Sequence, residues 1–235
     1  MYDSRRGATP PACEGFREVN LLDVYPRMTR NLAERAEWKA CTPENRAVAK
    51  RFGMEYFDGT RAQGYGGYRY DGRWNAVVRR MIEYYGLTGA SSILDIGCAK
   101  GFLLHDFREL LPGVSVAGID VSQYALDHAM ENVRPFLRLG NATELPFPDR
   151  SFDLVISINV AHNLPDALCR QAIREMERVG RRHKYLQVDA FRNEEERRKL
   201  EAWQLTAELI YDTAQWKRLL ADEGYTGAVY WTITE

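Results

Sequence analysis

A glycine turn directly after a short apolar run is the feature that most restricts how this chain can fold. Residues 93–96 read Ile-Leu-Asp-Ile, typical of a buried strand, and the turn from Gly97 to Gly101 leads into an amphipathic run that predicts a helix. In α/β sheets this order presents backbone N–H groups and a helix N-terminus to a ligand. Asp95, at the strand end, would repel a pyrophosphate but could accept a hydrogen bond from an ammonium group. The turn therefore favours a nucleoside that carries an amino acid.

Strand and helix patterns alternate on both sides of this turn. Besides 93–96, the predicted strands are residues 114–119, 134–139, 154–160, 184–189 and 228–234. The predicted helices are residues 74–85, ended by Gly86, then 122–132 with Ser122 as N-cap, 165–179, 194–210 and 213–223. Such alternation implies a three-layer α/β sandwich, a mostly parallel sheet covered by helices on both faces.

The first 74 residues differ in pattern from the rest. Residues 1 to about 30 have no period and are expected to form an arm that is poorly ordered or wrapped on the surface. Residues 32–52 are helix-like with a break at Thr42 and Pro43, an N-cap followed by proline at the first helical position. We therefore divide the chain into an N-terminal arm with helices and a lid (1–74) and a Rossmann-like catalytic domain (75–235).

The lid segment, residues 55–74, combines glycines, tyrosines and arginines. Five glycines between residues 59 and 72 exclude a regular helix or strand, and the aromatics make it too apolar for a solvated linker. One interpretation is an ordered plug at the end of the domain. The interpretation we favour is a lid over a ligand, because glycine hinges with aromatic and arginine contacts are typical of segments that close sites.

Composition excludes several classes of function. The 235 residues carry a formal net charge of −1 and are 45% hydrophobic, so nothing indicates nucleic acid or an anionic membrane as partner. No apolar run has spanning length, and the N-terminus does not look like a signal peptide. Four scattered cysteines without a C-x-x-C pair favour reduced thiols in a cytoplasm. We expect no metal, since no acidic pair has metal-ligand spacing.

Four motifs, in order, resemble the class I S-adenosylmethionine (SAM)-dependent methyltransferases. They are Asp95-x-Gly97-x-Ala99-x-Gly101, Gly118-Ile119-Asp120, Gly140-Asn141-Ala142-Thr143-Glu144-Leu145-Pro146-Phe147 and Ser151-Phe152-Asp153-Leu154-Val155. The resemblance covers roughly residues 75–225, and Ala99 departs from it by replacing a glycine. The family usually ends in two strands and this chain has room for one. The sheet is therefore expected to have six strands, or seven, or to place its last strand antiparallel.

The resemblance implies SAM as co-substrate and a set of residues that bind it. Gly97 and Gly101 would let the backbone approach the methionine part, with Asp95 and Ala99 beside them. Asp120 would accept hydrogen bonds from the ribose hydroxyls, with Val121 in the same set. Asn141 would meet the adenine amino group and the Ala142 N–H an adenine ring nitrogen. Phe147 fits either adenine stacking or a core plug.

The resemblance also places the end of the fourth core strand beside the sulfonium. Asn159 and Asn163 could hydrogen-bond an amine or carboxylate there, and His162 is a candidate general base, with packing or capping at a helix start as the alternative. Asp189 is a second candidate at this rim. Tyr65 and Tyr68 could stabilise the sulfonium by cation–π attraction. His105, His128 and His183 are expected on helix surfaces or a turn, exposed to solvent.

Three functions stay open. The first is a methyltransferase acting on a small-molecule metabolite, in the cytoplasm and possible as a homodimer. The second is an intramolecular cyclase resembling azetidine-2-carboxylate synthases, in which the α-amine of SAM attacks its own γ-carbon and methylthioadenosine leaves. The third is a non-catalytic SAM-binding subunit. The core motifs do not separate them.

Overall fold

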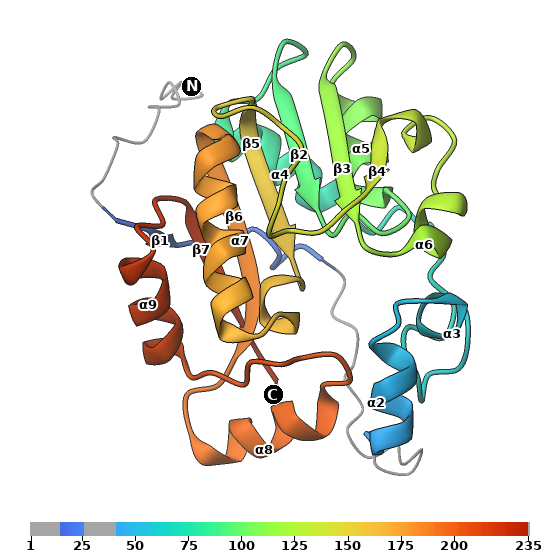
Figure 1. The fold of residues 1–235 in the computed structure, drawn as a ribbon. Helices are drawn as coiled ribbons and strands as arrows, with labels where there is room; N and C mark the ends of the chain where they lie inside the picture. The colour runs from blue at the N-terminus through green and yellow to red at the C-terminus, as the bar shows by residue number, and fades with distance from the viewer. Residues whose placement is uncertain (1–14, 26–40, 235) are drawn as a thin grey trace, which may run out of the picture.

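The structure, a computed structural model, describes residues 15–25 and 41–234. Its strands form one sheet in the order β1-β7-β6-β5-β2-β3-β4, with every neighbouring pair parallel (Figure 1). The strands are β1 (Arg17–Glu18), β2 (Ser92–Ile96), β3 (Ser115–Asp120), β4 (Leu137–Leu139), β5 (Phe152–Ile158), β6 (Gly180–Ala190) and β7 (Ala228–Ile233). This is the Rossmann-like sandwich that the alternating pattern predicts.

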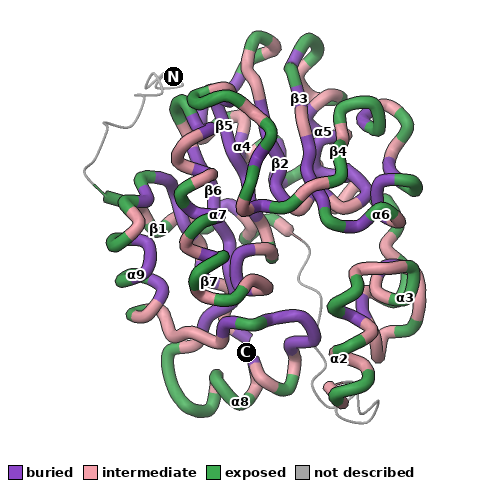
Figure 2. The backbone as a smooth tube through the Cα atoms, in the orientation of Figure 1, coloured by how far each residue is buried: buried purple, intermediate pink, exposed green. Residues whose placement is uncertain are grey.

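Helices cover both faces of the sheet. They are α2 (Pro43–Ala49), α3 (Met54–Phe57), α4 (Asn75–Tyr85), α5 (Phe102–Leu110), α6 (Gln123–Asp127), α7 (Asp166–Val179), α8 (Glu194–Trp203) and α9 (Thr213–Asp222), with short 3₁₀ turns η1 (Arg134–Phe136) and η2 (Ala161–Asn163). Apolar side chains of α4 and α5 pack with one set of strand residues, and those of α7 and α9 with the alternate set. Because successive strand residues point to opposite faces, β2 and β5 are buried on both sides (Figure 2).

The sheet edge corrects the expectation for the last strand. β7 pairs in parallel with β6, so it does not take an antiparallel position. The seventh strand comes from the N-terminal arm, since β1 pairs with β7 through Arg17 opposite Ala228. Leu21, just beyond it, is buried, and its N–H donates to the Tyr185 hydroxyl at 3.2 Å. Residues 17–18 thus belong to the sheet, whereas residues 1–14 and 26–40 lie outside the described part. The division at residue 74 stays a prediction.

Three predicted elements are shorter than their patterns, two because a tertiary contact takes over at the helix end and one because of a proline. The helix predicted to reach Asn132 ends at Asp127, because the Met130 N–H donates to the Lys100 carbonyl instead. The helix predicted over 194–210 ends at Trp203, and the Glu208 and Leu209 N–H groups donate to the His162 carbonyl. In the strand predicted over 134–139, proline favours a 3₁₀ turn, leaving only 137–139.

Three predicted helix-end signals, two at N-termini and one at a C-terminus, are confirmed. The Thr42 side chain accepts from the Asn45 N–H, with Pro43 at the start of α2. Ser122 caps α6 in the same way, accepting from the Ala125 N–H at 3.0 Å. Gly86 ends α4 in the left-handed conformation, at φ 61°. His183 corrects another expectation, because it lies half-buried in β6 with its ring centroid 4.9 Å from that of Tyr85.

Asp153 gives a test of the fold away from the candidate site. Its carboxylate accepts from the Ser92 N–H at 3.0 Å and pairs with Arg181 at 2.9 Å, joining the starts of β2, β5 and β6. We expect Asp153→Ala to lower the free energy of unfolding by about 1–3 kcal/mol in urea titrations, since the half-buried Ser92 N–H loses its acceptor and Arg181 its partner. Asp149→Ala is the control: that side chain is 74% exposed where it pairs with Arg178. Equal losses for the two variants would contradict this assignment.

Candidate functional site

The sheet order places the glycine turn at a topological switch point. The chain leaves β2 toward β3 on one side, while β5 pairs with β2 on the other. In open α/β sheets, ligands bind in the crevice outside the carboxyl ends of the strands at such a point. The turn after β2 and the turn after β5 meet here, because a Cβ at Gly97 would overlap the Val160 side chain.

The turn itself has an unusual backbone. Gly97, Ala99 and Gly101 have φ of 78°, 49° and 74°, the left-handed region that favours glycine. The Gly97 N–H donates to the Ile119 carbonyl at 2.7 Å, which ties the turn to β3. A Cβ at Gly101 would lie 2.7 Å from a Val133 methyl group. Conformation and space both require glycine at 97 and 101, whereas Ala99 is held in a strained conformation by its neighbours.

Two buried carboxylates lie beside the turn, Asp95 at the end of β2 and Asp120 at the end of β3. Asp120 accepts from the Ala99 N–H at 2.7 Å and from the Ser122 N–H at 2.8 Å, one bond to each oxygen. Each oxygen keeps a lone pair for a further donor, such as a hydroxyl. Burial raises the pKa of Asp120 even so.

Asp95 has no such support. Its side chain is buried, and no group in residues 15–25 or 41–234 donates a hydrogen bond to it. Burial raises its pKa to about 7, with a further contribution from the Asp120 charge. A buried carboxylate is costly in its ionised form unless a cation or donors compensate it. This position is therefore suited to a ligand with a positive charge.

Apolar surface lies next to Asp120 on the other side. Val121, which follows Asp120, is 53% exposed. Leu139, which pairs with Asp120 across β3 and β4, is 57% exposed. Such a pair could contact a flat ring. Asn141 is engaged locally, since its side-chain oxygen accepts from the Thr143 N–H at 2.9 Å and from the Thr143 hydroxyl at 2.5 Å. Its predicted contact with adenine stays a prediction and would share that oxygen with this turn.

Ala142 and Phe147 also follow the third core strand, β4. Ala142 is buried in the core cluster beneath α7, which leaves its backbone as the group that could meet a ligand. The Phe147 ring packs edge-on against Phe152, with centroids 4.9 Å apart, and against the same cluster. This packing supports the core-plug interpretation of Phe147.

The turn after β5 holds the predicted reacting rim. Asn159 is exposed at φ 60°, and its N–H donates to the Gln187 side chain at 2.8 Å. Asn163 is used at both ends of its amide, donating to the Asn159 carbonyl and accepting from the Thr206 hydroxyl, each at 2.8 Å. Of the two asparagines, Asn159 is therefore the one whose side chain is displayed, and Asn163 shapes the turn.

His162 lies inside the protein, 2% exposed. Its Nδ1 accepts from the Asp189 N–H at 3.2 Å, which places its proton on Nε2 in the neutral ring. This geometry supports the packing alternative for His162, and its role as a general base stays a prediction. Asp189 is equally enclosed, because the side-chain amides of Gln187 and Gln204 both donate to its carboxylate. A buried cluster of hydrogen-bonded polar side chains thus holds the turn after β5 in place. Its two glutamines belong to none of the four sequence motifs.

The lid segment packs onto the start of α5 directly after the glycine turn. The Tyr68 ring stacks on Phe102, with centroids 4.8 Å apart and planes at 19°, and Tyr65 packs against Tyr68 at 4.6 Å. Burial raises the pKa of Tyr68, and the nearby Tyr25 and Asp95 raise it further, so the phenol stays protonated beside the Asp95 carboxylate. Tyr65 lies one layer out, with its ring on Tyr56. Of the two predicted tyrosines, Tyr68 is brought to the glycine turn.

Sequence reasoning missed three residues that join the lid segment to this turn. Asp58 of the lid segment accepts from Lys100 in the turn at 2.6 Å and from the Tyr124 hydroxyl of α6 at 2.7 Å. The sequence offered one signal, a charged side chain at Lys100 within a turn of otherwise small residues. Its partner could not be identified without the structure.

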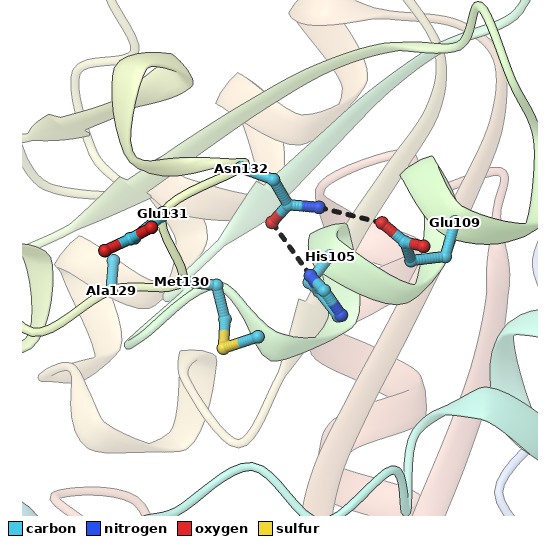
Figure 3. Close-up of a pocket in the computed structure, with 6 residues that line it drawn as sticks. All are labelled: His105, Glu109, Ala129, Met130, Glu131 and Asn132. Carbon is cyan, nitrogen blue, oxygen red and sulfur yellow. Dashed lines mark hydrogen bonds between the residues drawn. The ribbon is translucent and has the colours of Figure 1, made fainter.

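A separate hollow of about 470 Å³ lies on the outer side of α5 (Figure 3). Its polar groups bond to one another: Asn132 contacts His105 Nδ1 at 2.8 Å and donates to Glu109 at 3.1 Å. His105 is thus half-buried and bonded, which corrects its expected solvation, whereas His128 is exposed as expected.

Within the described residues, no three His, Cys, Asp or Glu side chains are grouped to hold a metal ion. No helix in that part of the chain is long and apolar enough to cross a membrane.

Asp95 gives a pH-dependent test of this geometry. The pKa of the Asp95 carboxyl is about 7 in the unliganded fold, compared with an ordinary value of 3.8, so ionisation is disfavoured there. The neutral form therefore stabilises the fold at low pH, and this stabilisation is lost as the pH rises from 3.8 toward 7. A bound ammonium group favours the ionised form. We therefore expect the affinity for SAM, measured by calorimetry, to increase several-fold from pH 6 to about 7.5. Asp95→Asn should bind weakly with a flat profile across that range. A retained pH dependence in this variant would show that another group titrates.

Comparison with known proteins agrees with the motifs. Residues 93–183 match the family model described as a methyltransferase domain. An uncharacterized methyltransferase of Schizosaccharomyces pombe is 34% identical over 111 residues, which are 42% of this chain and 38% of that protein. A demethylmenaquinone methyltransferase of Symbiobacterium thermophilum is 34% identical over 90 residues, 35% of this chain and 36% of that one.

A third relative has a solved structure. The uncharacterized methyltransferase YcgJ of Bacillus subtilis is 34% identical over 125 residues, 49% of this chain and 47% of that protein. The crystal structure of YcgJ has a TM-score of 0.48 at 22% identity, covering 62% of this chain and 66% of that one. This chain spans less than half the length of each of these three curated relatives. The family model's match, residues 93–183, includes β3, β4 and β5 and the turns that carry the candidate site.

Proposed function

We propose that this chain, whose residues 93–183 match a methyltransferase domain, transfers the methyl group of SAM to a small-molecule acceptor. The observation that carries the proposal is the Asp95 carboxylate, buried beside the glycine turn and without a donor in the described residues. The α-ammonium group of SAM would supply the missing charge.

The other parts of the cofactor have matching surroundings. Both Asp120 oxygens keep a lone pair for the ribose hydroxyls. The exposed side chains of Val121 and Leu139 offer an apolar surface for adenine. The stacked rings of Tyr68 and Phe102, directly after the glycine turn, would lie at the methionine end, where aromatic faces attract a sulfonium. The ends of the neighbouring strands β2, β3 and β4 thus carry groups that suit the ammonium, ribose and adenine parts.

The reaction needs little covalent chemistry from the protein. An acceptor nucleophile attacks the methyl carbon in line, the methyl–sulfur bond breaks, and its electron pair stays on sulfur as S-adenosylhomocysteine leaves. The protein binds, orients and excludes water. The exposed Asn159 side chain is available to orient an acceptor at this rim. The balanced net charge of −1 and the packed lid segment favour a small acceptor over a nucleic acid. Cytoplasmic location and a homodimer stay predictions from the sequence.

The packing of the lid segment also favours a second candidate, the intramolecular cyclase. Tyr68 stacks on Phe102 directly after the glycine turn, at the end where the amino acid part of SAM would bind. The Asp95 carboxylate could take a proton from the α-ammonium group. The freed amine would attack its own γ-carbon, and the γ-carbon–sulfur bond would break with its electron pair moving to sulfur. The products are azetidine-2-carboxylate and methylthioadenosine.

Product analysis tests the function directly. The purified protein is incubated with SAM, with and without a small-metabolite extract, and the nucleoside products are separated by chromatography. S-adenosylhomocysteine that forms only with the extract is the expected result. Methylthioadenosine formed without an acceptor, with azetidine-2-carboxylate, would overturn methyl transfer in favour of cyclisation. SAM binding with neither product, in any extract, would favour the non-catalytic subunit.

Asp120→Ala tests the ribose contact. We expect the variant to lose about 2–4 kcal/mol of SAM binding, because two hydrogen bonds to a carboxylate disappear. Asp127→Ala, an exposed acid on α6 in the same region, is the control. Calorimetry gives the affinities, and the melting temperature of each variant shows whether the turn has kept its fold without the Ala99 contact. Unchanged affinity with normal folding would mean that the ribose binds elsewhere.

A further inference from the structure

We infer that Asp58 is a positioning residue that holds Tyr68 over the cofactor end of the glycine turn by tying the lid segment to that turn. The inference rests on the proposed function, because SAM defines what Tyr68 covers. It adds a residue outside the four motifs and gives the lid segment a specific attachment point.

Asp58 connects three elements that are distant in the sequence. One carboxylate oxygen accepts from the Tyr68 N–H at 2.9 Å. The other accepts from Lys100 Nζ at 2.6 Å and from the Tyr124 hydroxyl at 2.7 Å. The lid segment, the turn after β2 and the helix after β3 therefore converge on a single side chain.

The ion pair at the centre of this cluster is enclosed. The Lys100 side chain is 8% exposed and that of Asp58 is 24% exposed. Burial alone would raise the pKa of Asp58, but hydrogen bonds from Lys100, Tyr124 and the Tyr68 N–H outweigh it, and the pKa lies below its usual value. Asp58 is thus ionised at neutral pH. Charge-assisted hydrogen bonds of this kind are stronger than neutral ones, and losing one partner leaves a buried charge uncompensated.

The cluster fixes both ends of the aromatic stack. Asp58 holds the backbone of Tyr68, and Lys100 lies two residues before Phe102, the ring on which Tyr68 stacks at 4.8 Å. Gly59, next to Asp58, is packed so closely that a Cβ would overlap the Glu55 carbonyl. The lid segment is thus a tightly packed loop, and its attachment sets where Tyr68 lies relative to Asp95.

Four variants test the inference: Asp58→Ala, Asp58→Asn, Lys100→Met and Tyr124→Phe. Asp71→Asn is the matched control, an exposed acid of the lid segment whose hydrogen-bond and ion-pair partner among the described residues is its near neighbour Arg73. Two quantities are measured for each: turnover of SAM, with kcat and KM separated, and amide hydrogen exchange of the peptide containing Tyr68. Exchange is followed without SAM, so the contact is tested even if the cofactor were different.

We expect Asp58→Ala and Lys100→Met each to lower kcat at least tenfold, and the Asp58→Ala/Lys100→Met double variant to be no worse than either single one. The Tyr68 peptide should exchange at least tenfold faster in Asp58→Ala than in the parent, while the sheet peptides keep their protection. Asp58→Asn and Tyr124→Phe should be intermediate, since each keeps part of the cluster, and Asp71→Asn should match the parent.

Two results would overturn the inference. One is parent-like exchange at Tyr68 in both Asp58→Ala and Lys100→Met. The other is faster exchange of the Tyr68 peptide in these variants with an unchanged kcat. The cluster would then stabilise the loop without affecting the reaction. Failure of the parent protein to bind SAM or consume it would instead refute the proposed function, and the exchange of the Tyr68 peptide would then decide the attachment alone.

Discussion

The hydrogen bonds that hold the glycine turn against β3 are the interaction on which the rest of the site depends. The Gly97 N–H donates to the Ile119 carbonyl and the Ala99 N–H to the Asp120 carboxylate, so the turn after one strand is shaped by the end of its neighbour. Its left-handed backbone directs Gly101 into α5 and leaves Asp95 at the switch point. Every other part of the candidate site, from Tyr68 to Val121, is placed relative to this turn.

Two carboxylates in one buried place would be unfavourable without compensation, and the structure treats them differently. Asp120 receives two backbone N–H groups, whereas the described residues give Asp95 none. In the proposed function, the ammonium group of SAM would compensate the second carboxylate. Lys100, the nearest lysine in the sequence, is already committed to Asp58, so it does not neutralise the pair but anchors the lid segment. Two separate roles follow for the charged groups: Asp95 is the candidate site for a cation, and the Lys100–Asp58 pair attaches the lid segment.

Much of the architecture could be predicted from local signals. The strand–helix alternation gave the parallel sheet, and the caps at Thr42 and Ser122 and the glycine after Tyr85 are confirmed. Element ends were less predictable. The backbone N–H groups of Met130 and Leu209 donate to carbonyls of distant turns, so the predicted helices stop before these residues. β1 was missed for a related reason: a strand of two residues has no period, and only the exposed edge of β7 makes it a strand.

The sequence by itself determined that a glycine turn with an acid at each of two strand ends follows the central strands, and its resemblance to SAM-dependent methyltransferases marked this turn as the candidate site. Only the tertiary structure decided which side chains serve it. His162 and Asn163 proved to be fastened inside or within the rim, and Tyr68 rather than Tyr65 reaches the turn. Asp58 and Lys100 are 42 residues apart, and pairs at such separation leave no periodic trace in a chain. Burial and long-range pairing depend on how the elements pack, and packing is a property of the folded whole.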